Sequence, residues 1–270
     1  MKNLILAVAI CVGFTSYSKP NWGKTGHRTI GEIATKHLEK RSLKKIKRLL
    51  DNESVAAASV YADDIKSDAK YNKYGSWHYV NFSEHKHYKE DPINPDGDIL
   101  QGIKTCILTI RSKESSKEQR AFSLKMLIHF LGDLHMPLHA GNKSDKGGND
   151  IKVKWFGTDS NLHRVWDSDM IDDYQMSYTE LADNNNSLSK DQIKELKKGT
   201  LLDWVNESRQ LALVLYSETN QDDKLGYKYM YQNFPNAQKQ LQKGGVRLSV
   251  VLNEVFKSKS SWLDTFLSNL

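Results

Sequence analysis

Hydrophobic side chains recur every three to four residues over most of the chain, which is the spacing of amphipathic helices. Ile30, Ile33 and Leu38 form such a stripe with His27, so a first helix is expected, opening at Gly26. Further helices are expected at residues 43–50, 54–65, 99–110, 120–134, 191–216, 225–231 and 237–256. The helix at 120–134 is apolar on most sides and should therefore lie at the centre of the fold.

Two segments depart from the helical spacing. The turn signal of residues 147–149 is followed by apolar side chains that alternate with polar ones through residues 151–155, which predicts a short β-hairpin. Residues 76–82 are also extended in character. Because no internal repeat and no Gly/Ser- or Pro-rich linker divides the chain, we expect one mainly α, multi-helix domain over residues 22–270.

The N-terminal segment has the pattern of a secretory signal peptide. Lys2 supplies a positive charge, residues 4–14 are apolar, and residues 16–18 offer small side chains for cleavage. The apolar run is well short of the roughly 20 residues that span a bilayer, so no membrane anchor is expected. We therefore expect residues 1–21 to be removed and the mature chain to be secreted or periplasmic.

The composition is that of an ordinary globular protein, with 39% apolar and 27% charged residues. Loss of residues 1–21 leaves a mild basic excess, which suits a polyanionic partner but is also common in other proteins. The basic residues at 44, 45, 47 and 48 form either a solvated helix face or a nucleic-acid contact. Only Cys106 remains after cleavage, so no disulfide can form within the mature chain, and bound metal is an alternative source of rigidity.

Histidine and aspartate recur at a spacing that suits metal binding. His129 and Asp133 lie four residues apart and therefore share one helix face, and His163 and Asp167 repeat this spacing. His139 follows a helix-ending proline and is free to turn towards a second site. A single such pair is more often a hydrogen-bonded histidine at the edge of a core. Two pairs with His139 between them favour zinc, which binds imidazole and carboxylate.

These motifs resemble the trinuclear-zinc single-strand nucleases and 3′-nucleotidases of the S1/P1 type, which share the zinc phospholipase C fold. The matching segments are Trp22–His27, Tyr61–Asp63, Trp77–Tyr79, His129–His139, Gly147–Asp150 and Leu162–Asp167. They occur in the family's order and cover the mature chain from its start to beyond its middle.

The resemblance implies three zinc ions and a ligand for each matched position. Asp63, His78 and His129 would hold one ion, and Asp133 would bridge it to a second. His27 and the amine and carbonyl of Trp22 would complete the second site. His139, His163 and Asp167 would hold the third.

The resemblance also implies a reaction. Phosphodiester bonds of single-stranded DNA and RNA would be cut to 5′-phosphate products, and 3′-nucleotides would lose their phosphate. Asp63 would also orient the attacking water. No obligate protein partner is expected.

Two further positions, Lys66 and Tyr79, each have two interpretations, and a third, Asn81, differs from the family's residue. Lys66 stands where relatives often have arginine, and is either a charge for the transition state or a helix-surface lysine. Tyr79 is either a platform on which a base stacks or a core tyrosine. Asn81 replaces the aspartate that reads the base edge in fungal members, so their base preference is not carried over.

Two alternatives to a nuclease remain. The related zinc phospholipases have glutamate where this chain has Asp167. A zinc-stabilised binding protein without catalysis is the other alternative.

The position of the mature N-terminus is the subject of two conflicting observations. Trp22 offers an amine to zinc only if it becomes the first residue. Yet Lys19 and Asn21 suit a signal peptidase poorly, and Ser16 and Ser18 suit it better. We expect a final terminus at Trp22, reached directly or by trimming.

Overall fold

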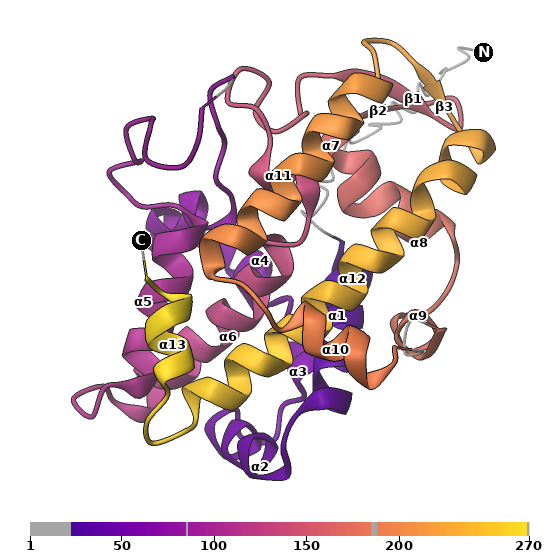
Figure 1. Ribbon diagram of the computed structural model, residues 1–270. Coiled ribbons are helices and arrows are strands. Elements are labelled where there is room, and N and C mark those ends of the chain that lie inside the picture. Colours follow the sequence, from indigo (N-terminus) through magenta and orange to yellow (C-terminus); the bar gives the residue numbers. More distant parts are fainter. Residues whose placement is uncertain (1–22, 85, 185–187, 269) are drawn as a thin grey trace, which may run out of the picture.

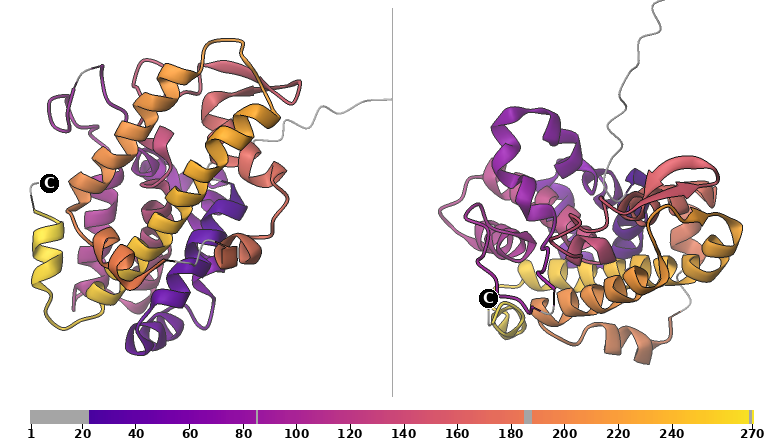
Figure 2. Two further views of the ribbon diagram at one scale, coloured as in Figure 1. Left: turned by 45° about the vertical axis from the view of Figure 1, so that its right-hand side comes forward. Right: turned by 90° about the horizontal axis from the view of Figure 1, so that it is seen from above.

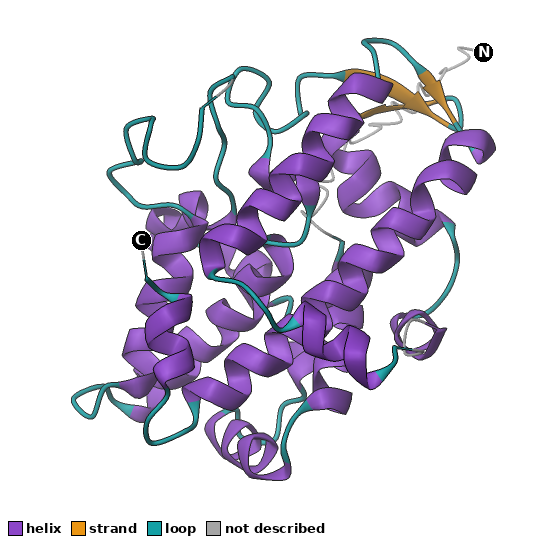
Figure 3. Ribbon diagram, viewed as in Figure 1, coloured by secondary structure: helices purple, strands orange, loops and turns teal. Residues whose placement is uncertain are grey.

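The computed structural model describes residues 23–84, 86–184, 188–268 and 270. The expected signal peptide and Trp22 lie outside these residues. Helices dominate the described part, and one small sheet lies at the opposite end of the molecule from α2 (Figures 1 and 3). The expected mainly α architecture is therefore confirmed. None of the described helices combines the length and apolar character that crossing a bilayer requires.

The first third of the chain forms one helix of 14 residues, α1, and several shorter helical segments. These elements are α1 (Lys24–His37), α2 (Lys40–Leu49), α3 (Val55–Ala58), α4 (Tyr61–Asp64), and the 3-10 segments η1 (Ile65–Ser67) and η2 (Ala69–His78). The middle third consists of α5 (Ile99–Arg111), α6 (Lys117–Asp133), the 3-10 turn η3 (Pro137–Ala140), strands β1 (Lys152–Trp155) and β2 (Thr158–Asn161), α7 (Leu162–Arg164), the π-helical turn η4 (Val165–Asp169) and α8 (Met170–Asp173).

The last third contains the longest helix. Its elements are α9 (Tyr178–Asn184), α10 (Lys190–Leu196), α11 (Leu201–Glu218), β3 (Lys224–Leu225), α12 (Tyr227–Val255) and α13 (Ser261–Phe266). Helix α12 packs against α1 and α6, and Figure 2 shows α11 and α12 from two further sides.

Helix α6 is the centre of the fold, as its apolar sequence predicts. Every residue from Met126 to Asp133 is buried, and α6 packs against α5, α12, α3 and α4. It begins at Lys117, three residues before the expected start, because Ser116 caps it: the Ser116 hydroxyl accepts from the N–H of Gln119, and the Gln119 side chain accepts from the N–H of Ser116.

The helix expected at 54–65 is broken, and the break frees a backbone carbonyl for a contact with the centre of the molecule. It divides into α3, α4 and η1, with a turn at Ser59 and Val60. The N–H of Asp63 donates to the carbonyl of Val60 at 3.2 Å. In a continuous α-helix it would donate to the carbonyl of Ser59. The Ser59 carbonyl instead accepts a hydrogen bond from Nδ1 of His129 at 2.7 Å. Breaking the helix therefore makes this carbonyl available to the centre of the molecule.

Two predictions about the later helices are wrong in detail. The segment 191–216 is two helices, because Thr200 caps a new helix, α11, with Asp203. The segments 225–231 and 237–256 are one helix, α12, which continues through Pro235. Proline lacks the N–H that would bond to the previous turn, but the buried face of α12 holds the helix together across this point.

The expected hairpin is present, and a third strand extends it. Strands β1 and β2 pair antiparallel, and β3 adds to β1 in parallel, giving the order β2-β1-β3. In the segment 76–82, the first three residues close η2, and only the residues from Tyr79 on are extended. The N–H of Val80 donates to the His139 carbonyl at 2.8 Å, so the end of η2 is fastened to η3.

Candidate metal centre

Helix α6 supplies two polar side chains to the interior of the protein. His129 and Asp133 are both fully buried and lie one turn apart. The ring of His27, on α1, stacks on that of His129 with centroids 3.9 Å apart. This approach requires glycine at position 132, because a Cβ there would lie 2.7 Å from Nδ1 of His27.

The Asp133 carboxylate faces four imidazoles. Its Oδ1 lies 3.3 Å from Nε2 of His27 and 3.2 Å from Nδ1 of His139. Its Oδ2 lies 2.8 Å from Nδ1 of His78 and 3.0 Å from Nε2 of His129. Donors that share one tetrahedral zinc at about 2.1 Å are about 3.4 Å apart. The four separations, 2.8–3.3 Å, are slightly shorter than this value, so the carboxylate and the imidazoles are grouped closely enough to share a cation.

Asp63 completes a group with two of these histidines. Its Oδ1 lies 3.9 Å from Nδ1 of His78 and 3.6 Å from Nε2 of His129, and these histidine nitrogens are 3.1 Å apart. A second group, of His27, His129 and Asp133, lies against the first. The three elements α4, η2 and α6 thus bring Asp63, His78 and His129 to one point.

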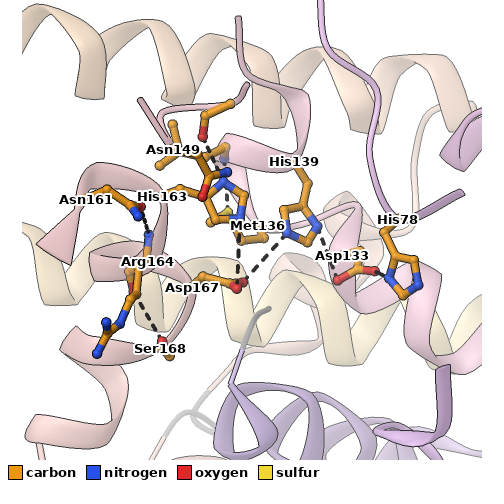
Figure 4. A network of polar contacts seen from close by, with 12 residues as sticks. His78, Asp133, Met136, His139, Asn149, Asn161, His163, Arg164, Asp167 and Ser168 are labelled. Carbon is orange, nitrogen blue, oxygen red and sulfur yellow. Dashed lines mark hydrogen bonds and ion pairs between the residues drawn. The ribbon is translucent and has the colours of Figure 1, made fainter. Parts of the chain in front are cut away.

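A third group lies beyond His139. His139 Nε2 is 3.7 Å from Oδ1 of Asp167, and His163 Nε2 is 3.9 Å from Oδ2 of the same residue. The π-helical turn η4 carries Asp167. Figure 4 shows one continuous row of contacts from His78 through Asp133, His139 and Asp167 to His163.

Backbone carbonyls orient two of the imidazoles. Nδ1–H of His129 donates to the Ser59 carbonyl at 2.7 Å, and Nδ1–H of His163 donates to the Gly147 carbonyl at 2.8 Å. A proton held on Nδ1 leaves the lone pair on Nε2, which is the atom that faces the carboxylates. Each carbonyl therefore fixes the tautomer that can bind a metal.

The charges of the cluster suit a cation. Burial lowers the pKa of His78 to about 4 and that of His163 to about 3, so both imidazoles are neutral at pH 7. Burial alone would raise the pKa of Asp133, but the neighbouring charges of His129 and His139 hold it well below its usual range. Neutral imidazole and ionised carboxylate are the forms that bind zinc.

The buried donor atoms of the cluster are also of the kind that a metal cation binds. Oδ1 of Asp133 and Nδ1 of His139 are buried and face each other at 3.2 Å, but no contact of either atom has the geometry of a hydrogen bond within the described part of the chain. Burying such atoms without a hydrogen bond costs free energy, which a bound cation would offset. Nitrogen and oxygen donors in compact groups of three fit Zn²⁺.

The remaining predicted residues lie at the edge of this cluster. Lys66 Nζ donates to Oδ1 of Asp63 at 2.6 Å. Tyr79 is 40% exposed and lines a cavity of about 490 Å³, together with Asn81 and Lys143. Tyr79 is therefore no core tyrosine. Trp22, the ninth expected ligand, lies outside the described residues.

Several groups that shape the site carry no signal in the sequence pattern. The Ser59 carbonyl belongs to a turn inside an expected helix, and a backbone acceptor is not visible in side-chain spacing. The far wall of the cavity comes from the irregular segment between η2 and α5, which includes Tyr88, Ile93 and Asp98. Pro92 and the dipeptides Asn94-Pro95 and Asp96-Gly97 indicate from the sequence that this segment is a loop, but they give no sign that it lines a cavity.

Comparisons with a family model, with curated proteins and with solved structures show what this chain is similar to. The family model described as S1/P1 Nuclease matches residues 22–257. Endonuclease 2 of Arabidopsis thaliana is 29% identical over 293 residues, which cover 94% of this chain and 98% of the plant protein. Nuclease S1 of Aspergillus oryzae is 28% identical over 174 residues, 58% of this chain and 57% of the fungal one. A solved structure, alpha toxin from Clostridium absonum, has a TM-score of 0.49 at 14% identity and covers 90% of this chain and 66% of the toxin.

The buried histidines predict how the metal-free protein responds to acid. An unfolded chain binds protons on His78 and His163 near pH 6.5, whereas the fold delays this to about pH 4 and about pH 3. These groups therefore lower the stability of the chelator-treated protein as the pH falls from 6.5 towards 4. The urea midpoint should fall over this range, and the fall should be shallower in His163→Asn. A midpoint of the unsubstituted protein that stays constant from pH 7 to 4.5 would contradict the burial of neutral imidazoles.

Proposed function

The chain belongs to the S1/P1 nuclease family, and on this premise we propose that it is a zinc-dependent endonuclease of single-stranded DNA and RNA. One observation carries the proposal: the Asp133 carboxylate joins groups of His and Asp side chains into a single buried cluster. The cluster lies beside a cavity whose wall includes Tyr79, the residue next to His78.

We propose three zinc ions with the nine ligands that the family's motif assigns. Asp63, His78 and His129 hold the first, Asp133 bridges to the second, and His27 with Trp22 completes it. The third is held by His139, His163 and Asp167. When bound, zinc ions lower the pKa of water towards 7 and stabilise charge on phosphate oxygens. The compact groups of buried nitrogen and oxygen donors support this assignment.

Two residues of this chain then act on the reacting groups. Asp63 accepts a hydrogen bond from the attacking water and so directs it towards phosphorus. Lys66 lies against Asp63, and its side chain is about one-third exposed, so its ammonium can face both the carboxylate and a phosphate oxygen. Its ammonium is a single point charge without the fork of arginine, and it contributes attraction rather than a bidentate hold.

The cavity beside His78 takes the base. Its volume of about 490 Å³ lies within the range of small-ligand sites, and it offers the Tyr79 ring for stacking. Stacking requires a base that is free of its duplex neighbours, which gives preference for single strands. Asn81 has both a donor and an acceptor, whereas aspartate only accepts, so the base read at this position differs from that of fungal members.

The same site removes the terminal phosphate of 3′-nucleotides and leaves 5′-phosphates on cleaved strands. The N-terminal pattern supports export and a secreted or periplasmic location, with no obligate protein partner. The phospholipase alternative has less support, because the matching family model and the curated relatives named above are nucleases. A binding protein without catalysis has no specific observation in its favour.

The bridging carboxylate gives the first test of this function. Asp133→Asn keeps the shape of the side chain but removes the charge that two ions share, so zinc content should fall by at least one ion per chain. Hydrolysis of single-stranded DNA should fall by at least about 100-fold, since even groups that only support a ligand contribute 10- to 100-fold. Asp64→Asn is the matched control, because Asp64 is half exposed and pairs with Lys24 on the surface. Asp133→Asn with full zinc content and unchanged turnover would disprove the bridge.

The stacking residue gives a second test. Tyr79→Ala should raise KM for oligonucleotides by about 10-fold, in line with 1–3 kcal/mol for a stacked base. The control Tyr79→Phe keeps the ring and should retain most of the affinity. Steady-state kinetics on matched single-stranded and duplex substrates measures both effects. Equal cleavage of the two substrates by the unsubstituted protein, below the duplex melting temperature, would refute the stacking role.

A further inference from the structure

A second large cavity lies far from the cluster of histidines. It has a volume of about 830 Å³ and lies between α2, the end of α5, the start of α6 and the end of α12. Eight of its thirteen lining residues are lysine or arginine, and none is aspartate or glutamate. We call this cavity the basic groove. Its cations come from three stretches that are distant in sequence, residues 41–48, residues 111–120 and Lys257, so folding itself gathers them.

Part of this charge has a structural role. Arg111 donates to the carbonyls of Val255 and Lys257 at 3.2 and 3.0 Å, and Lys45 donates to that of Phe256 at 2.6 Å. Cations at this position satisfy the last carbonyls of α12 and its negative dipole end. Lys117 pairs with Asp51 at 2.6 Å. Lys257 pairs with Glu254, and Nε of Arg120 donates to the Ser115 carbonyl at 3.1 Å. Five of the eight basic side chains therefore have a partner within the fold.

Three cations of the groove have no acidic partner within the described residues: Arg41, Arg48 and Lys113. All three are exposed. Arg41 and Arg48 lie seven residues apart on α2, with Lys45 between them on the same helix face. Like charges on one face repel each other, and a neighbouring anion removes this repulsion. The arrangement therefore favours a ligand that carries several negative charges.

The position of the groove relative to the metal centre suggests which ligand. Arg120 lines the groove near the start of α6, and Asp133 lies at the end of the same helix. At 1.5 Å per residue the two are about 20 Å apart. A strand stacked as in B-DNA, with one phosphate per 3.4 Å, covers this straight-line distance with about six nucleotides. A polynucleotide can therefore reach both places, whereas a mononucleotide cannot.

We propose that the basic groove binds the phosphate backbone of single-stranded substrates, away from the bond that is cut. The proposal rests on the nuclease function proposed above and adds a binding site for the polymer. Arginine is suited to it, because the guanidinium fork matches two oxygens of a phosphate. The groove raises the local concentration of long substrates at the metal centre and leaves the chemical step unchanged.

The test compares two triple variants of the zinc-loaded protein that lose the same charge. The groove variant is Arg41→Gln, Arg48→Gln and Lys113→Gln. The control variant is Lys190→Gln, Lys194→Gln and Lys239→Gln, which removes three exposed lysines of α10 and α12 outside the groove. Steady-state kinetics is measured on a dinucleotide and on a 30-nucleotide single strand, from 50 to 200 mM salt.

We expect the groove variant to raise KM for the 30-nucleotide strand about 10-fold at low salt, with kcat unchanged. Loss of three phosphate contacts, at about 0.7 each, should make the slope of log KM against log salt shallower by about 2. Kinetics on the dinucleotide should stay within twofold of the unsubstituted protein. The control variant should match the unsubstituted protein on both substrates.

Three results would overturn the proposal. One is an unchanged KM and salt slope for the long strand. Another is an equal loss on the dinucleotide, which would mean that the substitutions act through the metal centre. The third is loss of binding to vesicles with anionic lipid while the long strand is cut normally, which would assign the groove to a membrane surface. If the unsubstituted protein cuts no nucleic acid, the nuclease function fails. Fluorescence anisotropy with the same 30-nucleotide strand then still tests the groove.

Discussion

Asp133 carries a negative charge at a place with no exposed surface, and an ionised carboxylate buried in this way costs several kcal/mol unless neighbours compensate. Four imidazoles surround it at 2.8–3.3 Å, and they come from α1, η2, α6 and η3. The charges of His129 and His139 offset part of that cost and hold the pKa of Asp133 low, and a cation shared with the imidazoles would take over this role. The packing of four separate segments thus depends on what this carboxylate binds.

Backbone groups hold this arrangement in place without any disulfide among the described residues, where Cys106 is a buried free thiol. The Ser59 carbonyl fixes His129, and the Gly147 carbonyl fixes His163. The N–H of Val80 ties the segment after His78 to the carbonyl of His139. Each of these contacts joins a turn or loop to a ligand, so the irregular segments position the site while α6 supplies its rigid centre.

The sequence predicted those features that depend on side-chain spacing. The helical periodicity identified α1, α2, α5 and the central α6, and the four-residue spacing of His129 and Asp133 placed both on one face. Features that depend on the backbone were missed. The break at Ser59 lies within an apolar stripe that would suit a continuous helix, and the passage of α12 through Pro235 is a case in which tertiary packing outweighs local propensity. The convergence of Asp63, His78 and His129 came only from the family resemblance, since residues so far apart in sequence share no periodicity.

The central claim is that one carboxylate lies between two metal ions. X-ray diffraction from crystals of the zinc-loaded protein, recorded on both sides of the zinc absorption edge, tests it directly. Two anomalous peaks about 3.5–4 Å apart on either side of the Asp133 carboxylate, with a third among His139, His163 and Asp167, are the expected result. A map with no peak in bonding distance of Asp133, or with one ion that all four imidazoles share, would contradict it.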